Sequence, residues 1–182
     1  MLLSIQKLEL KKVRFEETYA PGRLDWSESG IRQTTPLHAV GEAELLEETD
    51  GEVRVTGKLT VSVEADCDRC LCLAKFSLDR NFDLFYQPNS AVEPVDEIAI
   101  SAGEAEIGFY QGAGIELEEV LQEQVLLMLP MHKLCGEECR GLCPVCGKNR
   151  NESKCDCREI PADDRWSGLK QFHINSEHEL EG

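Results

Sequence analysis

Six of the nine cysteines fall within 23 residues, from Cys135 to Cys157, with the spacing Cys-x3-Cys-x3-Cys-x2-Cys-x8-Cys-x-Cys. A segment this short holds too little apolar surface to fold without a covalent or metal-mediated constraint. The N-terminus lacks the basic start and long apolar run of a secretory signal, so we expect a cytoplasmic chain whose thiols stay reduced. Clustered cysteines in a reducing compartment are more often metal ligands than disulfides. The spacing therefore predicts a metal-binding module.

The centre of this cluster is the sequence CPVCG at residues 143–147, which is typical of a metal-binding knuckle. Two thiolates three positions apart can converge on one tetrahedral ion, and the glycine lets the backbone turn so that amides face the sulfur. Either Cys135 and Cys139 or Cys155 and Cys157 could complete the set of four. We favour the downstream pair, because the polar eight-residue loop between the two pairs closes easily. The predicted ligands are thus Cys143, Cys146, Cys155 and Cys157.

An all-thiolate set predicts a closed structural zinc, with an iron–sulfur centre as the rival. The pair Cys67 and Cys70 forms another C-x2-C motif, and Cys72 follows two residues later. This pair could lend ligands to the same metal or form a redox pair. No βαβ pattern surrounds it, as a thioredoxin-like motif would require, so a structural role is favoured.

Period-2 alternation dominates the first part of the chain. Apolar residues alternate with polar ones along residues 53–65 and again along residues 76–86, which predicts an antiparallel hairpin with Cys67, Cys70 and Cys72 at its tip. Looser alternation at 37–46, followed by a Thr-Asp-Gly turn at 49–51, predicts a further strand. Strands are also expected in the opening segment around residues 8–15 and at 95–101.

The period changes to 3–4 along residues 116–129, which predicts an amphipathic helix ended by Pro130. We therefore expect an α+β fold: a largely antiparallel β-sheet with one amphipathic helix and a small C-terminal cysteine-rich zinc module. The expected organisation is an antiparallel β domain at 1–131, a metal-binding module with a short terminal helix at 132–172, and a flexible tail at 173–182.

The net charge of −16 argues against a nonspecific grip on nucleic acid and favours a basic partner. Residues 132–158 are the exception, with six basic and four acidic side chains. No stretch approaches 18 consecutive apolar residues, so we expect no contact with a membrane. Phosphate-loop, nucleophile-elbow and Ser/His/Asp patterns are missing, so we expect neither an enzyme nor a small-molecule substrate.

The order of motifs resembles one known family. A hairpin with CDRCL at its tip is followed by the helix IELEEVLQEQVLLMLP, then by RGLCPVCGKNRN and DDRWSGLKQF. Over residues 37–172 this order is similar to the YceD family of large ribosomal RNA subunit accumulation proteins. The resemblance implies a factor of large-subunit maturation, needed for 23S rRNA to accumulate and without known catalytic activity.

With this resemblance, the expected partner is a large-subunit ribosomal protein or a 23S rRNA precursor. A locally basic face would dock it, and Arg165 with Trp166 could form a stacking platform. The predicted partner-binding residues are Arg140, Lys148, Asn149, Arg150, Arg165 and Trp166. The alternative is a thiol- or metal-responsive regulatory protein that uses Cys67, Cys70 and Cys72.

Overall fold

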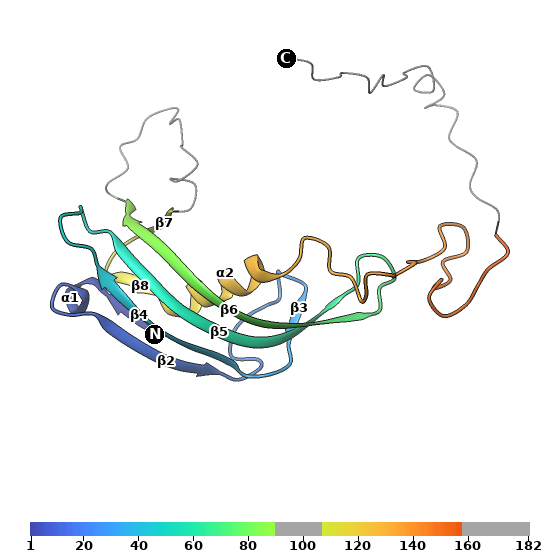
Figure 1. Cartoon of the computed structure of the whole chain (residues 1–182), viewed down its shortest axis with the longest axis horizontal. Coiled ribbons are helices and arrows are strands. Elements are labelled where there is room, and N and C mark those ends of the chain that lie inside the picture. The colour runs from blue at the N-terminus through green and yellow to red at the C-terminus, as the bar shows by residue number, and fades with distance from the viewer. Residues whose placement is uncertain (90–106, 158–182) are drawn as a thin grey trace, which may run out of the picture.

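The computed structural model describes residues 1–89 and 107–157 (Figure 1). Along the chain the elements are β1 (Leu2–Ser4), α1 (Ile5–Leu8), β2 (Val13–Tyr19), β3 (Ile31–Gln33), β4 (Leu37–Leu45), β5 (Val53–Asp66), β6 (Leu73–Pro88), β7 (Ile107–Tyr110), β8 (Gly114–Glu116) and α2 (Leu117–Met128).

The main sheet has the strand order β2-β4-β5-β6-β7, and β3 pairs with the far end of β5. All its pairings are antiparallel except β6 with β7, which is parallel. β1 and β8 form a separate two-stranded sheet. The predicted α+β class with a largely antiparallel sheet is confirmed, as are the hairpin of β5 with β6 and the position of α2.

The core lies between the main sheet and α2, which covers one face of it (Figure 1). The period-2 pattern turns alternate residues of β5 inward, so Val55, Leu59 and Val63 are buried. From α2, the residues Val120 and Val125 pack into the same cluster. This packing fixes the strands of the β5–β6 hairpin and the end of α2. The cysteine-bearing segments are the tip of that hairpin and the chain that follows α2.

A ladder of two glycines between two phenylalanines crosses four strands. Phe15, Gly41, Gly57 and Phe82 are successive register partners on β2, β4, β5 and β6. A Cβ atom at Gly57 would lie 2.7 Å from both the Phe82 ring and the carbonyl oxygen of Val40, and one at Gly41 would overlap the Thr56 carbonyl. Both rings are buried over the space that the glycines leave, so the glycines are a packing requirement.

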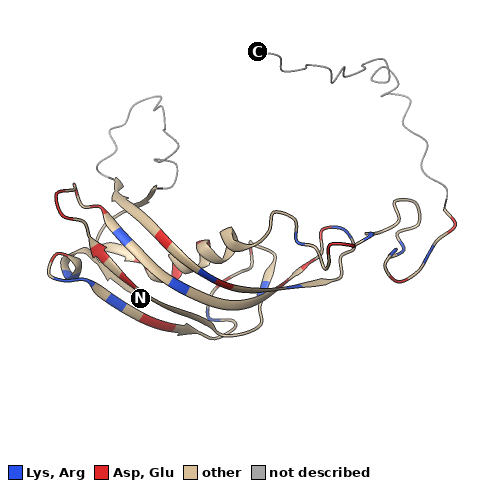
Figure 2. Ribbon diagram, in the orientation of Figure 1, with Lys and Arg blue, Asp and Glu red and all other residues tan. Residues whose placement is uncertain are grey.

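Charged residues recur along the strands of the main sheet (Figure 2), and on β5 they alternate with buried residues and so face away from the core. The Arg54 guanidinium donates two hydrogen bonds to the Asp83 carboxylate, at 2.8 and 2.7 Å, and Lys58 pairs with Asp79 at 2.7 Å. Exposed pairs of this kind contribute about 0–1 kcal/mol each. These ion pairs keep this face of the sheet solvated and add little to the free energy of unfolding.

The opening segment differs from the prediction. Residues 5–8 form the short helix α1 after β1, and within the stretch 8–15 the strand β2 begins at Val13. Ile5 and Leu8 lie three positions apart and both pack on the core, whereas Leu10 is exposed, so helical spacing rather than alternation decides this segment. The predicted strand at 95–101, the terminal helix and the tail at 173–182 lie outside the described residues. Within the described residues, no helix combines the length and apolarity needed to span a bilayer.

Candidate metal centres

The tip of the β5–β6 hairpin is joined to the segment that follows α2. The Asp68 amide donates to the Lys133 carbonyl at 2.9 Å, and the Lys133 amide donates back to the Asp68 carboxylate at 2.7 Å. Arg69 is bound on both sides: its carbonyl accepts from the Leu142 amide at 2.9 Å, and its guanidinium donates to the Cys139 carbonyl at 3.0 Å. These bonds place residues 133–142 along the hairpin tip.

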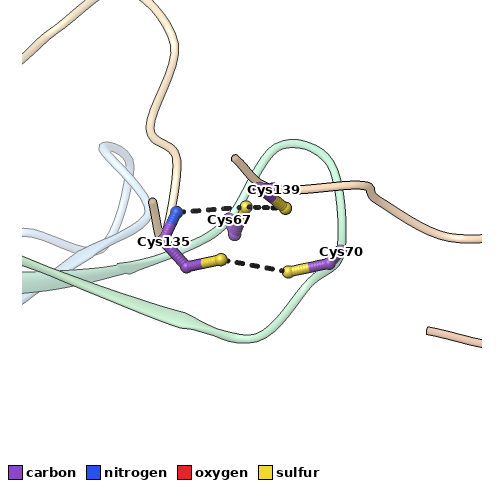
Figure 3. A group of neighbouring side chains, drawn as sticks. All are labelled: Cys67, Cys70, Cys135 and Cys139. Atoms are coloured by element: carbon purple, nitrogen blue, oxygen red, sulfur yellow. Dashed lines mark hydrogen bonds between the residues drawn. The ribbon is translucent and has the colours of Figure 1, made fainter. Parts of the chain in front are cut away.

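The contact brings four thiols together, which we call the proximal cluster: Cys67, Cys70, Cys135 and Cys139 (Figure 3). Their four sulfur atoms all lie within 4.8 Å of one another. The Cys67 and Cys139 sulfurs are 3.8 Å apart, and those of Cys70 and Cys135 are 3.5 Å apart. All nine cysteines of the chain are free thiols.

These separations match a single tetrahedral ion. With metal–sulfur bonds of about 2.3 Å, ligand sulfurs on a tetrahedron are about 3.8 Å apart. An iron–sulfur cluster spreads its cysteines over several irons and so needs wider spacing. Cys67, Cys70 and Cys139 are buried beside Ala74, and the half-buried side chains of Leu134 and Leu142 pack around them. The surroundings suit a closed structural site.

A second group, the distal cluster, consists of Cys143, Cys146, Cys155 and Cys157, whose sulfurs also lie within 4.8 Å of one another. The Cys143 amide donates to the Lys148 carbonyl at 2.8 Å, and the Gly147 amide donates to the Cys143 carbonyl at 2.9 Å. These bonds close the knuckle, and the loop up to residue 154 returns the chain to the second pair.

The C-x2-C knuckles of the two clusters share one backbone turn. The residue after the second cysteine has a positive φ in both, 61° at Leu71 and 72° at Gly147, and its amide donates to the carbonyl of the first cysteine at 2.9 Å. Glycine adopts this conformation without cost, whereas an L side chain such as that of Leu71 is strained by about 1–2 kcal/mol.

Backbone amides prepare one thiol of each knuckle for ligation. Burial raises the pKa of Cys67, but hydrogen bonds from the backbone at Arg69, Cys135 and Cys70 outweigh it and lower that pKa to about 6. Hydrogen bonds from the Cys146 and Val145 backbone likewise lower the pKa of Cys143 to about 6. Thiolates, not thiols, bind metal ions, so the backbone hydrogen bonds that lower these two pKa values favour the ligating form of each sulfur.

Two asparagines connect the distal loop to the proximal cluster and the hairpin tip that carries it. The Asn151 amide group donates to the Cys139 sulfur at 3.4 Å, which lowers the pKa of that thiol, while its oxygen accepts from the Arg140 amide at 2.8 Å. Asn149 donates to the Cys72 sulfur at 3.1 Å. The two clusters are therefore neighbours in one hydrogen-bonded unit.

The structure brings the four predicted ligands of the distal cluster together, and their role as ligands stays a prediction. Sequence reasoning left the partners of Cys67 and Cys70 open and did not identify the proximal cluster. The count of nine cysteines, enough for two sets of four and one remainder, was the available signal.

The predicted partner-binding residues are divided by their surroundings. Arg140, Lys148 and Arg150 are exposed. The side chain of Asn149 has intramolecular partners, because in addition to Cys72 it binds Glu152 at 3.1 Å and accepts from the Asn151 amide at 3.0 Å. Arg165 and Trp166 lie outside the described residues.

Comparison with known proteins gives one family and several relatives. The family model described as "Large ribosomal RNA subunit accumulation protein YceD" matches residues 55–173. An uncharacterized protein of Mycobacterium tuberculosis is 31% identical over 121 residues, which are 66% of this chain and 55% of the relative, and one of Mycobacterium bovis matches equally. One of Mycobacterium leprae is 29% identical over 103 residues, 56% of this chain and 45% of the relative. The chain spans about half the length of these curated relatives. No solved structure matches.

Proposed function

Because this chain belongs to the YceD family of large ribosomal RNA subunit accumulation proteins, we propose that it is a non-enzymatic factor of large ribosomal subunit biogenesis, needed for 23S rRNA to accumulate. The observation that carries the proposal is the family match over residues 55–173, which includes the β5–β6 hairpin, α2 and all nine cysteines. The family description names accumulation of an RNA and no reaction.

Each cluster holds one structural zinc in this proposal. Four thiolates at tetrahedral spacing leave no open coordination position for a substrate or an activated water, which a catalytic zinc needs. The proximal ion joins the hairpin tip to residues 133–142, and the distal ion closes the loop that follows. The zinc ions thus shape a docking surface.

The partner is a large-subunit ribosomal protein or the 23S rRNA precursor, met in the cytoplasm. The strongly acidic body suits the basic surface of ribosomal proteins, while the exposed Arg140, Lys148 and Arg150 suit RNA. The alternative of a thiol-responsive regulator is less favoured, since Cys67 and Cys70 belong to a cluster that excludes Cys72.

Deletion of the gene tests the proposal. We expect less 23S than 16S rRNA in the deletion strain, precursors of the large subunit in sucrose gradients, and co-sedimentation of the tagged protein with those precursors. Complementation with the Cys72→Ser variant should restore the profile, because Cys72 lies in neither cluster. An unchanged ratio of 23S to 16S rRNA in the deletion strain would remove the proposed function.

A further inference from the structure

A basic pocket lies between the two clusters. It has a volume of about 270 Å³ and is lined by Arg140, Arg150, Ser153, Lys154 and Cys155. Three of these five residues are cationic, and no carboxylate is among the described residues that line it. None of the three cations forms an ion pair within the described part of the chain. Three cations thus face one hollow in a protein of net charge −16.

The walls of the pocket are fixed by the two clusters. Arg140 follows a proximal ligand directly, and its amide donates to Asn151, which also binds the Cys139 sulfur. The Arg150 amide donates to the Gly141 carbonyl at 2.9 Å. Lys154 precedes Cys155 of the distal cluster. The backbone under each cation is therefore positioned before any ligand arrives, which lowers the ordering cost of binding.

The chemistry of the lining selects a phosphate group. Guanidinium groups bind phosphate oxygens in a bidentate manner, a lysine adds a point charge, and the Ser153 hydroxyl can donate a further hydrogen bond. The hollow is larger than one phosphate needs, which leaves room for the attached sugar.

The net charge of the chain does not prevent this. The Debye length is about 8 Å at physiological ionic strength, so carboxylates on the distant sheet are largely screened from an exposed site. Two carboxylates flank the lining residues along the chain, those of Glu152 and Asp156, and that of Glu152 accepts a hydrogen bond from Asn149. A zinc ion held by four thiolates carries a net charge of −2 and offsets part of the field of the three cations, so the pocket relies on their direct contact with the phosphate.

We propose that this pocket binds a backbone phosphate of single-stranded RNA. The inference deepens the proposed function, on which it rests, by naming the contact through which the protein would hold the rRNA precursor. Because a single pocket contacts few phosphates, the binding is weak and sequence-independent, and the remaining contacts of the assembly supply selectivity.

The test uses the full-length, zinc-loaded protein and a fluorescein-labelled oligouridylate of about 12 nucleotides, which is within the usual site size for single-strand binding. Fluorescence anisotropy is measured at about 50 and about 200 mM salt. We expect Arg140→Gln, Arg150→Gln and Lys154→Gln each to weaken binding about tenfold, as loss of one charge-assisted hydrogen bond does. Each should also flatten the salt dependence, which is about 0.7 in slope for each phosphate contacted.

Arg80→Gln on β6 is the matched control, since it removes the same charge from an exposed site away from the pocket and should bind as the wild type does. Metal content and circular dichroism verify that the variants are folded. Equal affinity of wild type and pocket variants would overturn the inference. The inference would also fail if inorganic phosphate bound to the pocket while the variants left RNA binding unchanged. That result would assign the site to free phosphate.

The two proposals fail separately. A normal 23S rRNA level in the deletion strain would remove the proposed function, whatever the anisotropy shows. Equal RNA affinity of all variants would remove the phosphate contact and leave the rRNA phenotype as it stands.

Discussion

Removing one proximal thiol should release residues 133–142 from the hairpin tip. We choose Cys70→Ser, because Cys70 is buried and serine keeps its size while losing the soft sulfur ligand. Cys72→Ser is the control two positions away, since Cys72 lies in neither cluster. We expect two bound zinc ions per chain in the wild type and in the control, and one in Cys70→Ser.

The size of the effect follows from the contacts of the released segment. Ordering its ten residues costs about 15 kcal/mol at roughly 1.5 kcal/mol each. The four hydrogen bonds to the tip that have oxygen acceptors return about 4 kcal/mol. Half-burial of Leu134 and Leu142 adds about 2 kcal/mol. The shortfall of about 9 kcal/mol is close to the roughly 10 kcal/mol that a structural zinc supplies.

Hydrogen exchange measured by mass spectrometry checks this estimate. In Cys70→Ser, amides of residues 133–142, including the Leu142 amide that binds Arg69, should exchange nearly as fast as in an unfolded chain. Amides of the main sheet should keep their protection, because the core does not depend on the cluster. If Cys70→Ser kept two zinc ions and native protection in 133–142, the reasoning would be refuted. Loss of zinc from the control would show that the ligands are wrongly assigned.

Two other substitutions test the packing and the knuckle turn. Gly57→Ala should lower the free energy of unfolding, measured in urea titrations, by about 1–3 kcal/mol, because its Cβ would collide with Phe82 and the sheet backbone. The control Gly136→Ala has open space around its Cβ and should change that free energy little. Equal effects of the two substitutions would contradict the glycine ladder. In Gly147→Ala the added Cβ meets no atom, but the backbone at φ 72° is strained for alanine. We expect the zinc affinity of the distal cluster, measured by chelator competition, to fall about fivefold, which is roughly 1 kcal/mol. An unchanged zinc affinity would mean that the turn carries no strain.

Local patterns predicted most of the sheet. β5 alternates apolar and polar residues almost without interruption, and α2 repeats apolar residues every three or four positions, so neighbours in sequence decide these elements. The expected strand around residues 8–15 holds only from Val13 onward, because half-buried Ile5 and buried Leu8 are too few to establish a helical period before it. The glycine ladder was also beyond prediction, because it depends on the register of four strands.

The cysteine clusters show the same limit. The distal cluster is nearly continuous in sequence, so its spacing sufficed to propose four ligands. The proximal cluster joins Cys67 and Cys70 to Cys135 and Cys139, and this meeting depends on how far the hairpin reaches and where α2 ends. No spacing rule carries that information, since it comes from the packing of the core between the two segments.

The proximal cluster also has a consequence for how the chain matures on the ribosome that makes it. The second of its thiols, Cys70, is synthesised 65 positions before the third, Cys135. At about 5–20 residues per second, the nascent hairpin carries an incomplete ligand pair for roughly 3–13 s. During this interval the tip is open to oxidants and to competing metals, and translation speed, not affinity alone, determines how long that exposure lasts.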